Sequence, residues 1–199
     1  MTGNAEQRWA MLALLFVTRI GLGFQFQTMA SVGEPVAQEL QVGFASIGTL
    51  IGLFMIPGLV LSIPAGFAGR YVSDKVLTAL GLLLLAAGGA VAATSSSFAL
   101  LSVGRLLCGA GFVLCSIYYT KMTADWFAGH ELATAMAVLV TSWATGIAMG
   151  QIAHSWLAIN FGWRTAFLVA TLYGTAGAVA LMVLYRAPPP TKKAAAKAP

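Results

Sequence analysis

The chain has 199 residues, of which 59% are hydrophobic and only 9% are charged, and its formal net charge is +5. Soluble domains are about half apolar and about a quarter charged, so these few charges could not cover the surface of a soluble globule. The composition therefore excludes the soluble classes and predicts one bundle of membrane helices.

Six segments stay apolar for about 20 residues, the length that crosses the hydrocarbon core of a bilayer. In chain order, we expect them at residues 9–28, 44–69, 76–94, 98–120, 132–156 and 165–185. The first is too long for a signal-peptide core, so we expect it to stay in the mature protein. Pro57 and Pro64 are expected to kink or loosen the second. The expected fold class is an all-α membrane protein with six transmembrane helices.

The loop cations predict the orientation, because cytoplasmic loops carry an excess of lysine and arginine. With the amino terminus inside, the cytoplasmic side holds Arg8, Arg70, Lys75, Lys121, Arg186, Lys192, Lys193 and Lys197, whereas the exterior loops hold Arg164. We expect a cytoplasmic amino terminus over 1–8, a bundle over 9–186 and a flexible cytoplasmic tail over 187–199. The basic charge is interpreted as this orientation signal, and no nucleic-acid partner is expected.

Two arginines fall inside the predicted spans, where an ionisable residue is costly and indicates function. Arg19 lies ten residues after Trp9, about 15 Å into the bilayer at helical rise. Gly23 and Gln27 follow it at i+4 and i+8, on one face. A planar guanidinium beside a small residue and an amide suits a carboxylate or a similar anion. The alternative is that Arg19 caps carbonyls of neighbouring helices.

Arg105 is the second intramembrane arginine, and Tyr119 lies on the same expected wall of its helix. A structural or gating role and a direct substrate contact both remain open for Arg105. Neither arginine has an aspartate or glutamate partner inside a predicted span, which favours an anionic solute. No paired carboxylates, histidine cluster or nucleophile with a base is visible, so the sequence predicts no catalytic site, no metal and no cofactor.

Two segments contain recognisable motifs. GRLLCGAG has Arg105, Gly109 and Gly111 in an R-x-x-x-G-x-G pattern, and FGWRTAF has the pattern GWR-x-x-F. These segments resemble the fourth helix of the major facilitator superfamily and the segment before its sixth helix. The segment PAGFAGRYVSDK resembles a degenerate form of the family's signature between helices two and three. There Arg70 matches the signature arginine, Gly69 replaces its aspartate, and Asp74 and Lys75 follow. TKMTADWFAGHELATAM and FQFQTMASVGEPVAQEL resemble bacterial cyanate and organic-anion permeases of this family.

The resemblance implies one six-helix half of a twelve-helix transporter, with a single substrate pathway between the halves. It implies that helices one, two, four and five face that pathway, and that Arg70, Asp74, Lys75, Gly109 and Gly111 belong to gating or structural motifs. It also implies a multi-pass protein of a bacterial inner membrane whose partners are the lipid bilayer and a small solute.

The resemblance leaves two functions open. The first is transport of a small organic or inorganic anion by alternating access, through a homodimer or with a separate second half. The second is a truncated or partner-dependent half-transporter without transport activity of its own.

Overall fold

The computed structural model describes residues 2–129 and 131–188, which form helices joined by short turns. The helices are α1 (Thr2–Ser31), α2 (Gly33–Leu40), α3 (Phe44–Leu53), α4 (Ile56–Ala68), α5 (Asp74–Ala93), α6 (Phe98–Trp126), α7 (Leu132–Phe161) and α8 (Trp163–Leu184). Within these residues, six segments are long and apolar enough to cross a membrane, with α3 and α4 forming one of them. The predicted six-span, all-α fold is confirmed. The tail expected at 187–199 lies outside the described residues from 189 onward.

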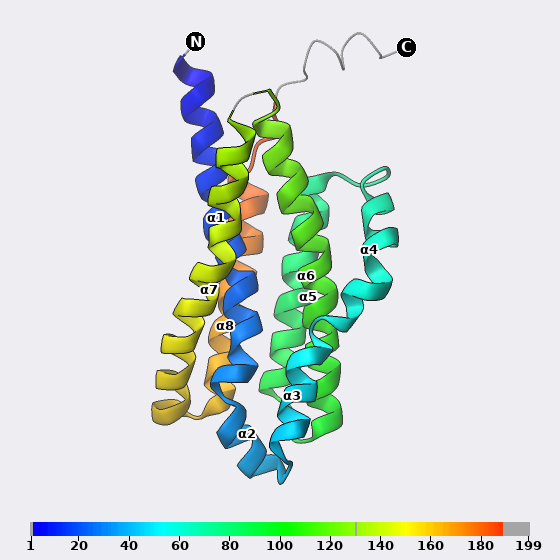
Figure 1. Ribbon diagram of the computed structural model, residues 1–199, viewed down its shortest axis with the longest axis vertical. Helices are drawn as coiled ribbons and strands as arrows, with labels where there is room; N and C mark the ends of the chain where they lie inside the picture. Colours follow the sequence, from blue (N-terminus) through cyan, green and yellow to red (C-terminus); the bar gives the residue numbers. More distant parts are fainter. Residues whose placement is uncertain (1, 130, 189–199) are drawn as a thin grey trace.

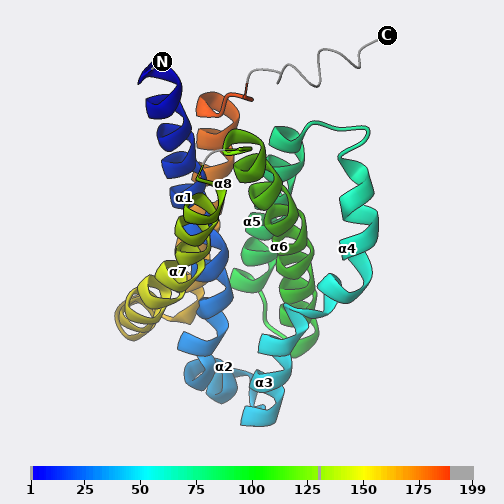
Figure 2. The same ribbon diagram turned by 45° about the horizontal axis from the view of Figure 1, so that its top comes forward.

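The long helices run along a common axis, and both ends of the described chain lie at one end of the bundle (Figure 1). α1 packs beside α7 and α8, and α5 packs between α6 and α8. α4 stands away from the other helices and packs on α6 (Figure 2). Much of its apolar surface is therefore exposed, including Leu59 and Ile63.

The second span is divided by a turn between Leu53 and Ile56. Pro57, in the first turn of α4, has no N–H to donate, and its ring excludes the carbonyl of the residue four positions earlier. The helix is interrupted here, as expected for Pro57, whereas Pro64 lies inside α4 without dividing it. Gly109 of α6 fits against the break, where a Cβ would clash with the Phe54 carbonyl and lie 3.0 Å from Pro57 Cδ.

The short helix α2 was not predicted, because its segment was interpreted only as a break between spans. Eight residues are too few to cross a membrane, so a search for spans misses it. Val32 and Val36 are fully buried in an apolar cluster with Phe167 of α8, at the end of the bundle opposite the chain ends, which is predicted to face outward. α2 ends where Gln41 adopts a left-handed conformation, with φ 54°.

A clamp of polar contacts ties three connections together at the same end, and we call it the outer clamp. Arg164 Nη1 and Nη2 donate to the Glu39 carboxylate at 3.0 and 2.7 Å, and Nη2 also donates to the Ser95 carbonyl at 2.9 Å. Trp163 Nε1 donates to Glu39 at 2.7 Å. The hydrogen bond from Arg164, followed by that from Trp163, lowers the pKa of Glu39.

Candidate functional site

Arg19 lies between α1 and α7, where it is half-buried. Its Nη1 donates to the Leu139 carbonyl at 2.7 Å and to the Ser142 hydroxyl at 3.0 Å, both on α7. Its Nε is buried and finds no acceptor among the described residues. The guanidinium therefore holds α1 to α7 with one nitrogen and still has donors without a partner.

The face of α1 predicted from the spacing of Arg19, Gly23 and Gln27 does lie against one neighbour, α7. A Cβ on Gly23 would clash with the Trp143 carbonyl, so Gly23 allows the two backbones to approach closely. Gln27 Nε2 donates to the side-chain oxygen of Gln151 on α7 and, at 3.4 Å, to the Ser31 hydroxyl. Gly23 thus contributes space for packing, while Arg19 and Gln27 carry the polar groups.

Tyr119 is fully buried in the core cluster shared by α1, α6 and α7. Its hydroxyl has no hydrogen-bond partner among the described residues, and the same holds for Ser116 Oγ and Thr123 Oγ1. These three residues of α6 follow at i, i+3 and i+7, so they share one helix face. Buried polar atoms are nearly always paired with protein or water, so these three hydroxyls are exceptions among the described residues.

Arg105 is 0% exposed, unlike Arg19. Its Nε donates to the Leu50 carbonyl at 3.0 Å, and its two terminal nitrogens donate to the Gln25 and Phe26 carbonyls at 3.4 Å. The guanidinium also lies over the Phe54 ring, 4.8 Å from its centroid. With each nitrogen bound to backbone and no surface exposed, Arg105 ties α6 to α1 and α3. This geometry favours the structural role over the substrate contact that the sequence left open.

Four aromatic side chains from four spans form a closed ring of contacts, which we call the aromatic square. Phe26 of α1 lies 5.2 Å from Phe54 at the break of the second span, and Phe54 lies 5.4 Å from Phe112 of α6. Phe112 lies 5.1 Å from Trp143 of α7, and Trp143 lies 5.3 Å from Phe26. Single-helix spacing does not reveal such a set, because its members belong to different helices.

The predicted motif residues at the other end of the bundle form separate contacts. Lys121 of α6 donates to both carboxylate oxygens of Asp74 at 2.7 Å, and Lys75 donates to the Tyr185 carbonyl at 2.9 Å. Arg70 is exposed and stacks over Phe67, 4.9 Å from the ring centroid. The Asp74 and Lys75 contacts join the ends of α5, α6 and α8, whereas the Arg70 contact stays at the end of α4.

The motif glycines mark close approaches of helices. A Cβ on Gly111 would clash with the Gly81 carbonyl and lie 2.5 Å from the Leu85 nitrogen, so Gly111 lets α5 and α6 touch. At Gly69, where the family signature has aspartate, a Cβ would lie 3.0 Å from the Tyr118 ring. The Tyr118 hydroxyl donates to the Ala65 carbonyl at 2.6 Å, which holds the ring in that place. Tyr118 thus occupies the space that a longer side chain at 69 would need.

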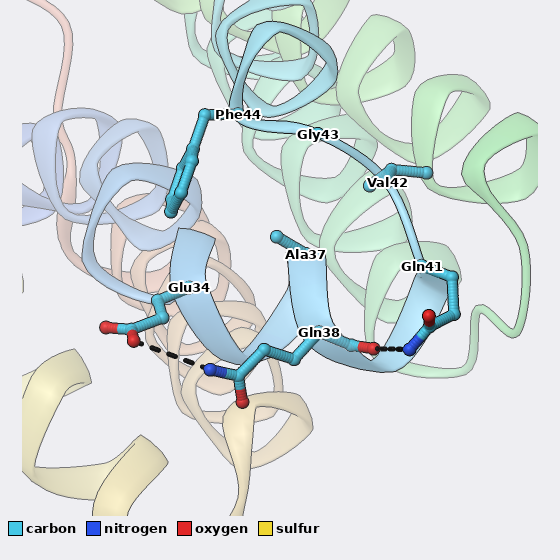
Figure 3. Close-up of a pocket in the computed structure, with 7 residues that line it drawn as sticks. All are labelled: Glu34, Ala37, Gln38, Gln41, Val42, Gly43 and Phe44. Carbon is cyan, nitrogen blue, oxygen red and sulfur yellow. Dashed lines mark hydrogen bonds between the residues drawn. The ribbon is translucent and has the colours of Figure 1, made fainter.

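A shallow hollow also opens beside the turn between α2 and α3, at the end of the bundle that holds the outer clamp (Figure 3). It is lined by Glu34, Ala37, Gln38, Gln41, Val42, Gly43 and Phe44. Gln38 donates to Glu34 at 3.4 Å and Gln41 donates to the Gln38 carbonyl at 2.7 Å, so its polar groups partly satisfy one another. Its charged member is an acid, which repels an anion, and the arginine site is therefore the stronger candidate. Within 2–129 and 131–188, no group of histidine, cysteine and acidic residues is arranged to hold a metal ion.

Comparisons with known proteins agree with this helical arrangement. The chain is 24% identical over 172 residues to a gallate transporter of Pseudomonas putida, covering 84% of this chain and 37% of that protein. It is 26% identical over 196 residues to a probable polyol transporter of Arabidopsis thaliana, covering 93% and 36%. The crystal structure of a bacterial homologue of the lysosomal transporter Spinster, inward-facing and occupied, superposes with a TM-score of 0.81 at 18% identity, covering 92% of this chain and 45% of that one.

The chain spans 37–42% of the length of three of the curated relatives that it matches. Its fold is that of half of a full transporter. The solutes named for the relatives differ, so they do not select one for this chain. The family model described as Major Facilitator Superfamily matches residues 8–199, and the chain is therefore a multi-pass membrane protein that belongs to this family of transporters.

Proposed function

We propose that this chain forms one half of the pathway of a small anion, organic or inorganic, with Arg19 as the group that binds the anion. The observation that carries the proposal is the half-buried guanidinium of Arg19, which keeps donors without a partner deep in a span. A charge at that depth is costly, so it is usually retained only where a function requires it. A bound carboxylate would supply the missing acceptors and the missing counter-charge.

The surroundings of Arg19 support an anion over a cation. The acidic residues of the described helices lie near helix ends, at Glu6, Glu34, Glu39, Asp74 and Asp125. Arg19 therefore has no acidic neighbour in the middle of the bundle, and its field attracts negative charge. The gallate transporter among the relatives is named for a carboxylate, in agreement with the resemblance to organic-anion and cyanate permeases, although the polyol transporter is named for neutral solutes.

The proposal includes the setting of the chain. We place it in a bacterial inner membrane with residues 1–8 and 187–199 on the cytoplasmic side, because the loop cations lie there. Transport by alternating access needs a second six-helix bundle that rocks against the first around a midplane site. That bundle is supplied by a second copy of the chain or by a separate half.

Uptake of labelled acetate, benzoate and cyanate into proteoliposomes tests the role of Arg19. Arg19→Ala should abolish uptake while the protein stays folded and inserted, because the positive charge and the N–H donors of the guanidinium are lost. Ser142→Ala is the matched control: it removes one acceptor of Arg19 and keeps the cation, so uptake should persist. Normal uptake by Arg19→Ala would contradict the proposal.

A second candidate is a half-transporter that carries nothing by itself. The observation behind it is that the fold is that of half of a full transporter. The mass of the purified chain in nanodiscs, with lipid subtracted, separates the two. A dimer supports self-assembled transport, whereas a monomer without flux supports dependence on a partner half.

A further inference from the structure

The aromatic square lies where the predicted pathway-facing spans meet. Its members come from α1, the break between α3 and α4, α6 and α7, the spans that correspond to helices one, two, four and five. Phe54 is fully buried, but Phe26, Phe112 and Trp143 are only partly buried. Three of the four rings therefore keep part of their surface exposed.

Two members of the aromatic square lie within about two helical turns of Arg19 or of a residue that it binds. Arg19 donates to Ser142, the residue that precedes Trp143 on α7. On α1, Phe26 follows Arg19 by seven residues, about 10.5 Å along the helix, and lies on the same face. Aromatic side chains on a helix lean toward its amino terminus, so the Phe26 ring leans toward Arg19. A carboxylate at Arg19 would place the body of the solute beside these rings.

The charges around the aromatic square favour a negatively charged ligand. Aromatic rings also attract cations, but one ring of the square already has the Arg105 guanidinium over it. Arg19 adds a second positive charge nearby, and the described residues place no acidic side chain beside either arginine. A cationic solute would be repelled, whereas a flat ring that carries a negative charge fits both groups.

We infer that the aromatic square binds the planar body of an aromatic carboxylate whose carboxylate group lies at Arg19. Offset and edge-to-face contacts between rings stabilise such a complex beyond simple burial. This inference rests on the proposed function, because it needs an anion at Arg19. It adds a substrate class and a second group of binding residues.

Equilibrium binding of benzoate, cyclohexanecarboxylate and acetate to the purified full chain in nanodiscs tests the inference. Benzoate should bind about tenfold more tightly than acetate, the size of an aromatic-pair contribution of about 1.4 kcal/mol. Cyclohexanecarboxylate has a similar size but is not planar, and it should bind less tightly than benzoate. Phe112→Leu and Trp143→Leu should bring benzoate to within about twofold of acetate and leave acetate unchanged. Leucine keeps an apolar side chain at each site, so folding should be preserved.

Phe161→Leu is the matched control, because this exposed ring lies outside the square and its replacement should change no affinity. Arg19→Gln should weaken the binding of all three acids. Equal affinities for benzoate and acetate, an unchanged benzoate preference in Phe112→Leu and Trp143→Leu, or equal affinities for benzoate and cyclohexanecarboxylate would overturn the aromatic subsite. In any of these cases, weaker binding of every acid to Arg19→Gln would leave the anion site at Arg19 in place. Wild-type affinities in Arg19→Gln, or no binding of any acid to the wild type, would overturn both the anion site and the aromatic subsite.

Discussion

Gly23 of α1 and Gly146 of α7 face each other so closely that a Cβ on Gly146 would lie 3.1 Å from Gly23 Cα and would clash with the Ile20 carbonyl. Where lipid surrounds the helices, close van der Waals packing and interhelical hydrogen bonds hold them together. This crossing lies one turn from Arg19, so the distance between the two backbones also decides how the guanidinium reaches Leu139 and Ser142.

Gly146→Ala should therefore destabilise the protein by about 1–3 kcal/mol, the usual cost of adding atoms to a filled interior. Thermal unfolding in detergent measures the change. Gly52→Ala is the matched control, because a Cβ on Gly52 meets nothing within 4 Å, and alanine raises helix propensity. Equal unfolding temperatures for Gly146→Ala and the wild type would show that the crossing is loose.

Replacing Arg105 should affect folding before it affects binding. Arg105→Lys keeps the charge but cannot reach the Leu50, Gln25 and Phe26 carbonyls together. Each hydrogen bond from a charged donor contributes about 1.5–3 kcal/mol, so the variant should unfold at a clearly lower temperature. Unchanged thermal stability combined with lost anion binding would instead assign Arg105 to the solute.

The Asp74–Lys121 ion pair should contribute little to stability. The side chains of Lys121 and Asp74 are 48% and 19% exposed, and exposed pairs contribute about 0.2–1 kcal/mol. A double-mutant cycle with Asp74→Asn and Lys121→Gln measures the coupling. A coupling well above 1 kcal/mol would mean that this end of the bundle is held by the pair.

Acid should weaken the outer clamp. Arg164 and Trp163 lower the pKa of Glu39 in the folded chain, so the unfolded chain binds a proton more readily than the folded one. The stabilisation is therefore present above the ordinary glutamate pKa of about 4.3 and is lost as pH falls through the lower, folded value. Because Glu39 is exposed, the effect should be small.

Unfolding temperatures measured between neutral and acidic pH test this linkage. The wild type should lose stability toward acid faster than Glu39→Gln, which has no carboxylate to protonate at this position. Parallel pH profiles for the two proteins would show that the clamp does not depend on the charge of Glu39.

The six spans could be predicted from the sequence, because whether a segment crosses a membrane depends on the local run of apolar residues. The glycine-rich pattern of the fourth span also pointed to the family before any comparison. Gly109 and Gly111 allow close packing at the positions where the pattern places them. The cytoplasmic location of both ends remains a prediction from loop charge.

Only the tertiary structure separated Arg19 from Arg105. Both are arginines inside apolar spans, and although Arg105 lies in the R-x-x-x-G-x-G pattern, that pattern does not show which carbonyls its guanidinium contacts. Each nitrogen of Arg105 donates to a carbonyl, of residue 25, 26 or 50, whereas Arg19 uses one nitrogen on residues 139 and 142. The aromatic square likewise joins four segments between residues 26 and 143. Apolar length is a property of one segment, but the pairing of a donor or the contact of a ring depends on which distant helices lie beside it.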